Sequence, residues 1–460
     1  MSDEKQTLKF APKNASETSK AFAVFHATSA SGGAMCIAAI LATWFSVFMT
    51  DTMKIPAAAA SLIMFISTFW DAINDPIMGV IADKTKTKVG RYRPYFLISP
   101  LLLTFFSAML WVNPDFSTRG KIIYILIMYI GYGMTVTMYT MPQTAILPAC
   151  VKSNDRRNQI VSLGAGFSAL AFTVGSSFSE QIKGFFEKTL HISNGYIAMV
   201  ICCGILACIS FWGLFATSDE KYVSHVKEQP GIGSLINVMK HKELYPFILV
   251  WIMASVGYGL NFSSTVYYLM YYMKRPDLIT VYFLITSVGG LASMFLLLPF
   301  LLKILKSGHR ALIVTQMISI VGYGLLFFTG KINPYYMIIL SAVVGLFSTM
   351  ENALVNVLVN DAIDYMQWKD GISVNGVISS IKGFAQKCGN TITSAGVLAI
   401  LGASGYVAGD IEGQPASAMM AINIIKFGIP VILGILMILC LKFNPVEKHK
   451  AEIEAMKENM

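Results

Sequence analysis

Long apolar segments alternate with short polar segments along almost the whole chain. A helix needs about 20 apolar residues to cross the roughly 30 Å hydrocarbon core of a bilayer. Twelve segments reach that length, and we predict a transmembrane helix over each of them. The predicted bounds are 24–50, 58–82, 94–113, 121–149, 158–182, 195–217, 244–273, 279–304, 310–330, 334–362, 373–403 and 416–443.

A longer polar stretch divides the twelve segments into two groups of six. It covers residues 218–243 and combines several charges with Pro230, Gly231 and Gly233, a composition typical of a linker. We therefore predict an all-α membrane protein with one six-helix bundle over 1–217, a cytoplasmic linker over 218–243 and a second six-helix bundle over 244–443. A short cytoplasmic tail follows over 444–460.

Composition and charge agree with this organisation. Of the 460 residues, 55% are hydrophobic and 13% are charged, about half the charged fraction of an ordinary soluble domain. The loops predicted to be cytoplasmic hold about twice as many Lys and Arg residues as the outer loops, which places both termini in the cytoplasm. The net charge of +9 follows this topology and gives no reason to expect a nucleic-acid partner. The polar start of the chain does not resemble a cleavable signal peptide.

Other classes of protein lack support in the sequence. The seven cysteines lie in or at the ends of apolar segments and include no CxxC pair, which argues against disulfides and a zinc site. No H-E-x-x-H motif, nucleophile elbow or glycine-rich phosphate loop is present in the sequence. We therefore predict that the protein is not an enzyme and has no cofactor.

The second apolar segment contains two acids, Asp71 and Asp75, one helical turn apart. An ionised acid at bilayer depth costs about 2.5–3.5 kcal/mol on insertion scales, so two on one face need a cation, a proton or water. Asn74 beside them and Thr137 in the fourth segment supply further oxygens, which are the ligands that hard cations prefer. We predict a transported-cation site here, for Na+, H+ or Li+. The alternative is that the acids pair with a buried base such as Lys387.

The loop between the second and third segments carries a second motif. Residues 79–84 read Gly-Val-Ile-Ala-Asp-Lys and are followed by Gly90 and Arg91, which resembles the loop signature of the major facilitator superfamily. The resemblance implies that Asp83, Lys84 and Arg91 form a conformational latch. The alternative is an ordinary basic cytoplasmic loop.

Further segments resemble one family within that superfamily. They are the run Trp70–Gly79, the sequence Gly-Arg-Tyr-Arg-Pro at 90–94, and the segments at 131–138, 360–365 and 384–389. In this order they are similar to the glycoside-pentoside-hexuronide:cation symporters, whose best-known members include melibiose permease. The resemblance implies a major-facilitator fold with two six-helix bundles and a substrate between them.

The resemblance also assigns roles to individual residues. Asp71, Asn74, Asp75 and Thr137 match the positions of the cation site in sodium-coupled members of the family, and the complete set favours Na+ over H+. Lys387 matches a lysine near that site, and the resemblance implies a role in coupling.

The substrate site departs from the family. Where melibiose-type members carry two acids, an arginine and a tryptophan that bind the sugar, this chain has Met35, Thr140, Ala165 and Thr144, which argues against a galactoside bound in that manner. Polar and aromatic residues near the expected cavity are the remaining candidates for substrate binding: Trp70, Tyr132, Tyr139, Thr140, Glu351 and Asn352. For the aromatic residues the alternative is helix packing, and for Glu351 it is an ion pair with Lys387.

The predicted function is therefore secondary active transport, in which inward movement of a sugar or glycoside is coupled to a cation. The alternative is an H+-coupled or uncoupled carrier of a non-sugar amphipathic solute. The expected partners are a small carbohydrate and the lipid bilayer. The resemblance places the protein in the inner or cytoplasmic membrane of a prokaryotic cell.

Overall fold

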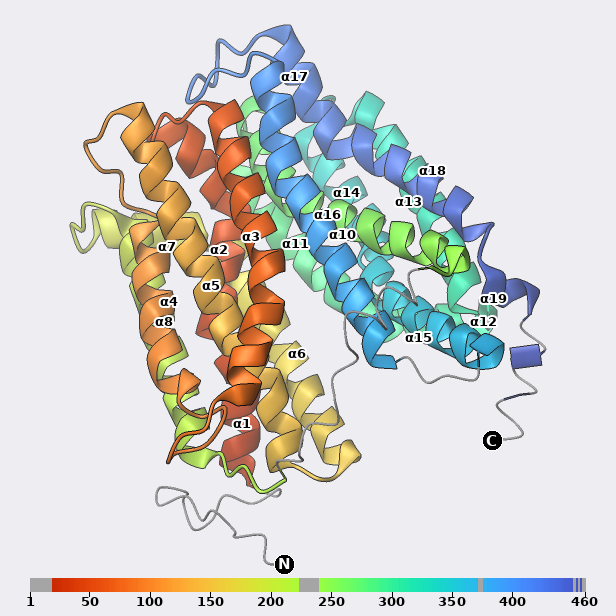
Figure 1. Ribbon diagram of the computed structural model, residues 1–460. Helices are drawn as coiled ribbons and strands as arrows, with labels where there is room; N and C mark the ends of the chain where they lie inside the picture. The colour runs from red at the N-terminus through yellow and green to blue at the C-terminus, as the bar shows by residue number, and fades with distance from the viewer. Residues whose placement is uncertain are drawn as a thin grey trace, which may run out of the picture. The chain divides into compact units, whose positions relative to one another are not determined.

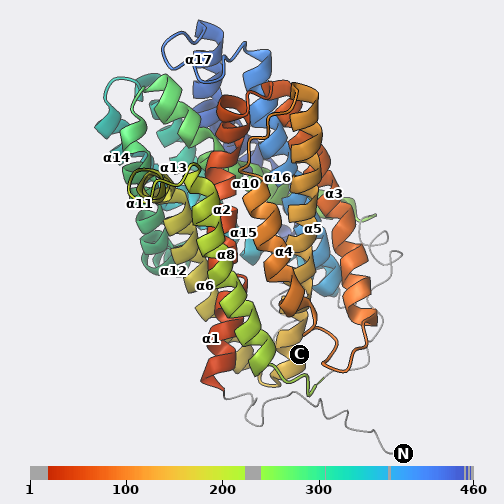
Figure 2. The ribbon, with the colours of Figure 1, turned by 90° about the vertical axis from the view of Figure 1, so that its left-hand side faces the viewer.

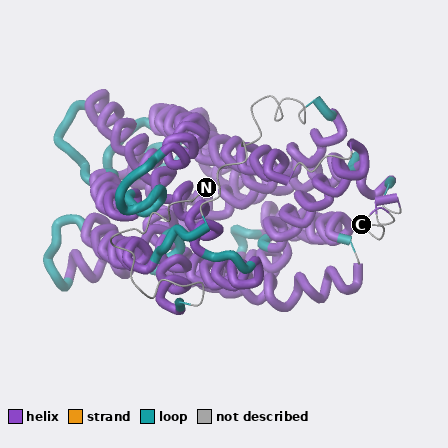
Figure 3. The backbone as a smooth tube through the Cα atoms, turned by 60° about the horizontal axis from the view of Figure 1, so that its bottom comes forward, coloured by secondary structure: helices purple, strands orange, loops and turns teal. Residues whose placement is uncertain are grey.

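The computed structural model describes residues 19–222, 240–305, 307–370 and 375–449, together with residues 452, 453 and 456. Within these ranges the chain forms helices and loops and no β-strand, apart from one isolated bridge between Thr87 and Gly90 (Figure 3). Most of the predicted linker, residues 223–239, and most of the predicted tail lie outside the described residues.

The chain divides into two compact units, and the first comprises residues 1–55 and 66–227. The helices that lie in it wholly or mainly are α1 (Lys20–Ser29), α2 (Gly33–Val47), α3 (Ala57–Lys84), α4 (Tyr95–Met109), α5 (Thr118–Cys150), α6 (Asn154–Ser177), α7 (Ser179–Lys188) and α8 (Gly195–Thr217), and a π-helical turn spans Phe48–Thr52. Here α2 packs against α6 and α8, and α4 packs against α5 and α8 (Figure 1). Figure 2 shows α1 beside α8.

The second unit comprises residues 56–65 and 228–460. Its helices are α10 (Tyr245–Tyr267), α11 (Ile279–Ala292), α12 (Leu298–Leu305), α13 (Gly308–Thr329), α14 (Pro334–Ser348), α15 (Met350–Asp370), α16 (Asn375–Ala403), α17 (Ala416–Asn423), α18 (Ile429–Leu441) and α19 (Pro445–Lys448). Short 3₁₀ turns span Lys242–Leu244 and Pro276–Leu278, and π-helical turns span Tyr268–Tyr272, Ser293–Leu297 and Ile424–Gly428. Within this unit α10 packs against α16 and α18, and α13 packs against α14, α15 and α18.

Small polar residues start several of the long helices. Ser117 accepts a hydrogen bond from the backbone N–H of Gly120 at the start of α5, at 3.3 Å. Asn194 caps α8, and Asn333 caps α14 in the same way. Because the first N–H groups of a helix have no partner within the helix, these side chains define where each apolar segment becomes helical.

The prediction of an all-α membrane protein is confirmed, and each of the twelve predicted spans has a helical counterpart. Ten helical stretches of the described chain are long and apolar enough to cross a membrane. The other two predicted spans correspond to α4, which is shorter, and to α16, which contains more polar residues. The first predicted span is broken between α1 and α2, and the tenth is broken at Thr349. The fifth ends at Ser177, earlier than predicted, because α7 follows as a separate helix.

Candidate functional site

Helix α3 positions the two acids of the second span. Four alanines, residues 57–60, form its first turn after Pro56, and the helix continues without a break through residue 76. The spacing of four residues therefore places Asp71 and Asp75 on one face, as predicted. Both side chains are half-buried, and Asn74 is buried with 6% of its surface exposed.

A hydrogen bond joins Asp75 to α5. The hydroxyl of Thr137 donates to Oδ1 of Asp75 at 2.8 Å, and Thr137 is buried. Hydrogen bonds to a charged acceptor are stronger than those between neutral groups. The structure therefore brings together two of the four residues predicted for the cation site, from two different helices.

The carboxylate of Asp71 lies directly against the backbone of α5. A Cβ atom at Gly133 would be 2.0 Å from Oδ1 of Asp71 and 2.8 Å from its Cγ. No side chain fits in that space, so glycine is required for this approach. Sequence reasoning did not assign Gly133 to the site, although it lies in a segment that carries the family resemblance, residues 131–138.

These two contacts have the same spacing on both helices. Asp71 and Asp75 are one turn apart on α3, and their partners Gly133 and Thr137 are one turn apart on α5. Since each step along α3 is matched by a step in the same direction along α5, the two helices run parallel at this point. The sequence spacing alone predicted the first pair but not the register between the helices.

The donor set suits a small hard cation or a proton. It offers two carboxylates, one hydroxyl and the side-chain amide of Asn74, whose buried Nδ2 has no hydrogen-bond partner among the described residues. Within the same part of the chain no group of three or more His, Cys, Asp or Glu side chains gathers to hold a metal ion. Neutral oxygens and carboxylates are the ligands that monovalent and other hard cations prefer.

The predicted substrate residues of the first unit lie on the same two helices. Trp70 precedes Asp71 and is 38% exposed, and Tyr132 and Thr140 on α5 are half-buried. Tyr139 is only 5% exposed and packs against Phe211 of α8, with ring centroids 5.0 Å apart. Tyr139 is therefore a core residue of the first unit in this structure.

The remaining predicted residues lie in the second unit. Oε1 of Glu351 is buried and lines a cavity of about 50 Å³, in which the amide of Gln316 is its neighbour. That volume is well below the roughly 300 Å³ of a typical small-molecule pocket, so in this conformation the space beside Glu351 does not enclose a sugar. Lys387 is half-buried on α16, and the side chain of Asn352 lies outside the described part of the chain.

The predicted latch lies in a loop that Glu220 holds. The carboxylate of Glu220 accepts hydrogen bonds from the backbone N–H groups of Arg91, Tyr92 and Arg93 at 2.9, 2.9 and 3.2 Å. Gly90 has a φ of +129°, and a Cβ there would be 2.7 Å from Oε1 of Glu220, so this position requires glycine. Sequence reasoning missed Glu220, because it lies about 130 residues further along the chain.

The side chain of Arg93 also joins this loop to the end of α8. Its guanidinium is fully buried, donates two hydrogen bonds to the carbonyl of Phe215 at 2.8 and 3.1 Å, and stacks over the Phe215 ring. Burial lowers the pKa of Arg93, and the nearby Glu220 opposes that shift. Of the predicted latch residues, Lys84 is exposed and Arg91 is half-buried, while the side chain of Asp83 lies outside the described residues.

Sequence reasoning also missed a buried lysine in the second unit. Nζ of Lys426 donates to the carbonyl and to Oδ1 of Asn261, at 3.3 and 3.2 Å, and to the hydroxyl of Thr265. It also lies 4.8 Å from the ring centre of Tyr282. The available signal was that Lys426 lies in the interior of the last predicted span, 416–443, whose other charged residue, Lys442, lies at its end.

Comparisons with known proteins agree on one family. Residues 27–448 match the family model described as MFS/sugar transport protein. The chain is 27% identical over 435 residues to the uncharacterized symporter YnaJ of Bacillus subtilis, covering 92% of this chain and 91% of that protein. It is 26% identical over 423 residues to the isoprimeverose transporter of Lactiplantibacillus pentosus, covering 90% of this chain and 87% of that protein.

The fold is similar to that of solved transporters. The crystal structure of the nucleoside transporter NupG superposes with a TM-score of 0.63 and covers 92% of this chain and 98% of that chain. The sequence identity is 12%, so this likeness concerns the fold alone.

Proposed function

Because the chain belongs to the MFS/sugar transport protein family, we propose that it is a secondary active symporter that couples inward movement of a sugar or glycoside to Na+. The protein is a multi-pass membrane transporter and not an enzyme. The names of two relatives, a symporter and an isoprimeverose transporter, support coupling and a carbohydrate substrate. We place it in the cytoplasmic membrane with both termini inside the cell.

The observation that carries the cation site is the matched register of α3 and α5. Asp75 contacts Thr137, and Asp71 contacts Gly133 one turn earlier on both helices. We assign Na+ to the oxygens of Asp71, Asp75 and Thr137 and to the side-chain amide of Asn74. Binding of a cation offsets part of the charge of two half-buried carboxylates, which otherwise cost free energy inside a bilayer.

Coupling requires that Na+ and sugar each bind one conformation of the carrier more tightly than the other. In this proposal the loaded carrier opens to the cytoplasm by alternating access. Trp70, Tyr132 and Thr140 are our candidates for substrate contacts, because they lie on the two helices that hold the cation residues. The family resemblance is the ground for a coupling role of Lys387. It is also the ground for a conformational latch formed by Asp83, Lys84 and Arg91.

A second candidate function is H+-coupled or uncoupled transport of a non-sugar amphipathic solute. It rests on Met35, Thr144 and Ala165, which replace the sugar-binding residues of melibiose-type relatives. Two carboxylates one turn apart can also bind a proton, so the site by itself admits this chemistry.

The test is uptake of labelled glycosides, pentosides and uronides, isoprimeverose included, into membrane vesicles with and without a Na+ gradient. Wild type is compared with Asp75→Asn and with the matched control Asp115→Asn, an exposed acid of the same unit. Li+ and a pH gradient replace Na+ in parallel assays. We expect Na+-stimulated uptake of at least one sugar by the wild type and the control, and loss of the stimulation in Asp75→Asn.

Two results would contradict the proposal in different ways. If uptake is equally fast without Na+ at every pH, transport is not coupled to a cation. If no sugar moves while Na+ still protects the purified wild type, but not Asp75→Asn, against thermal unfolding, the cation site stands and the substrate is of the second class.

A further inference from the structure

The second unit contains a small, partly open cavity between α10, α13, the junction of α14 and α15, and α18. Its volume is about 50 Å³. Since one buried water needs about 10–15 Å³ on this scale, the cavity has room for roughly three to five waters. A space of this size suits water, a proton or a small ion.

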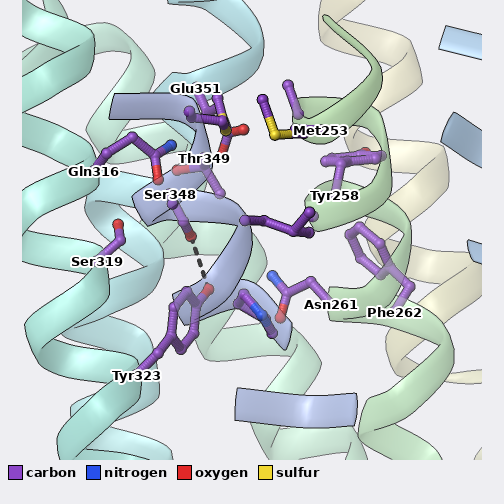
Figure 4. A pocket seen from close by; sticks show the side chains of 16 residues that line it. Met253, Tyr258, Asn261, Phe262, Gln316, Ser319, Tyr323, Ser348, Thr349 and Glu351 are labelled. Atoms are coloured by element: carbon purple, nitrogen blue, oxygen red, sulfur yellow. Dashed lines mark hydrogen bonds between the residues drawn. The ribbon is translucent and has the colours of Figure 1, made fainter. Parts of the chain in front are cut away.

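Three buried polar atoms of the lining have few or no protein partners. Nε2 of Gln316, Oγ of Ser319 and Oε1 of Glu351 are buried; Oγ of Ser319 has no hydrogen-bond partner among the described residues, and the amide of Gln316 lies beside the carboxyl of Glu351. Figure 4 shows Gln316 and Ser319 along α13, opposite Tyr258 and Asn261 of α10, with Glu351 at one end. Buried polar atoms are nearly always paired in folded proteins, so three around one small space indicate a shared polar occupant.

The charges around the cavity are unbalanced. Glu351 is the one acid among the sixteen lining residues, all of which belong to the described chain, and none of them is Lys, Arg or His. The other titratable groups that face it are the phenols of Tyr258 on α10 and Tyr323 on α13, and α14 and α18 contribute none. An ionised carboxylate in these surroundings would lack a compensating cation, which is costly in a membrane interior.

The buried lysine of this unit, among the described residues, is engaged elsewhere. Lys426 directs its ammonium to Asn261 and Thr265 and is absent from the cavity lining. It uses all three of its N–H donors on those oxygens. Lys426 therefore does not neutralise Glu351.

We propose that Glu351 is a proton-binding site of the carrier, separate from the cation site on α3 and α5, that gains and loses its proton through water in this cavity. The proton adds to a carboxylate oxygen, changes the side-chain charge from −1 to 0, and comes from and returns to water. If the protein is the proposed symporter, protonation of Glu351 makes its transport sensitive to pH. Only this effect on transport rests on the proposed function; proton binding by Glu351 does not.

The donor types favour a proton over a metal cation. Oε1 of Gln316 lies toward Gly434, 3.1 Å from the position that a Cβ would take there, so the amide presents N–H groups to the carboxyl side. An amide N–H and hydroxyls surround a carboxylic acid and water well, because such a site both donates and accepts hydrogen bonds. The N–H groups of an amide donate hydrogen bonds and do not coordinate Na+.

The experiment measures protonation directly, in purified full-length protein reconstituted in lipid. Infrared difference spectra between acidic and alkaline samples report the carbonyl stretch of a protonated carboxyl. We expect a band in the wild type that is lost in Glu351→Gln and retained in Glu243→Gln. Glu243 is the matched control, because its carboxylate pairs with Lys369 at 2.6 Å.

A second variant keeps the test informative if Glu351→Gln does not fold. Ser319→Ala removes one hydroxyl from the cavity, and we expect the band to shift, because the frequency depends on hydrogen bonding to the carboxyl. The proposal is overturned if the wild type has no such band, or if Glu351→Gln retains it.

Transport supplies an independent readout. We expect wild-type uptake to depend on pH, Glu351→Gln to lose that dependence, and both to keep their response to Na+. A pH dependence that is the same in both proteins overturns the inference and leaves the Na+ symport proposal intact. If uptake does not respond to Na+ but the infrared band behaves as expected, the symport proposal is wrong and Glu351 is still a proton-binding site.

Discussion

The hydroxyl of Thr137 donates a 2.8 Å hydrogen bond to Oδ1 of Asp75 and so joins α5 to α3 within the first unit. Thr137 is buried and Asp75 is half-buried, so the bond is shielded from water on one side. A hydroxyl that binds a carboxylate can turn its oxygen toward a cation, because the hydrogen of a hydroxyl rotates freely. The first prediction tests this pair.

Thr137→Val keeps the shape of the side chain and removes its oxygen. A hydrogen bond to a charged group contributes about 1.5–3 kcal/mol, so we expect the apparent affinity for Na+ to fall roughly 10- to 100-fold. Thr137→Ser keeps the hydroxyl and is the control. The measurement is the Na+ concentration that half-saturates uptake; equal values for the Val and Ser variants would remove Thr137 from the cation site.

Gly133→Ala tests the approach of Asp71 to α5. The added methyl group would collide with Oδ1 of Asp71 at 2.0 Å, whereas a methyl group at Gly166 of α6 would meet nothing within 4 Å. Overpacking of this kind costs about 1–3 kcal/mol, so we expect Na+ affinity roughly 5- to 100-fold weaker in Gly133→Ala.

Gly166→Ala is the control for that variant, and it also gains the higher helix propensity of alanine. Na+-stimulated uptake and Na+-induced thermal stabilisation are measured for both. If the two variants respond to Na+ alike, Na+ binding does not depend on the close approach of Asp71 to Gly133.

Glu220→Ala tests the loop between α3 and α4. It leaves the backbone N–H groups of Arg91, Tyr92 and Arg93 without their acceptor, and we expect the free energy of unfolding of the first unit to fall by about 1–3 kcal/mol. Glu412→Ala is the control, because Glu412 forms one exposed ion pair with Lys274. Thermal unfolding in detergent measures both, and an equal midpoint for both would show that the loop does not depend on Glu220.

Lys426→Met tests the buried ammonium of the second unit. Methionine keeps the apolar stem but removes the three N–H donors that bind the oxygens of Asn261 and Thr265, so we expect a loss of about 1–3 kcal/mol in stability. The exposed Lys442 provides the control substitution Lys442→Met. The comparison uses unfolding midpoints; a Lys426→Met protein as stable as its control would contradict a structural role for this ammonium.

The sequence alone was sufficient for the fold class and for one face of the cation site. Twelve apolar segments predicted the helices, because a lipid-facing backbone must satisfy its hydrogen bonds within each segment. The spacing of Asp71 and Asp75 predicted a shared face, because helical periodicity is local. The family resemblance added Thr137 as a candidate from a distant part of the chain.

Only the tertiary structure decided which groups meet across helices. The match of Asp71 with Gly133 and of Asp75 with Thr137 depends on the register of α3 against α5, which packing determines and no local pattern encodes. The same reason explains why Glu220 and Lys426 were missed: their partners lie more than 120 residues away in the chain. Glu351 was visible as an acid in an apolar helix, but its cavity and its polar neighbours Gln316 and Ser319 come together only once α10, α13 and α18 pack around it.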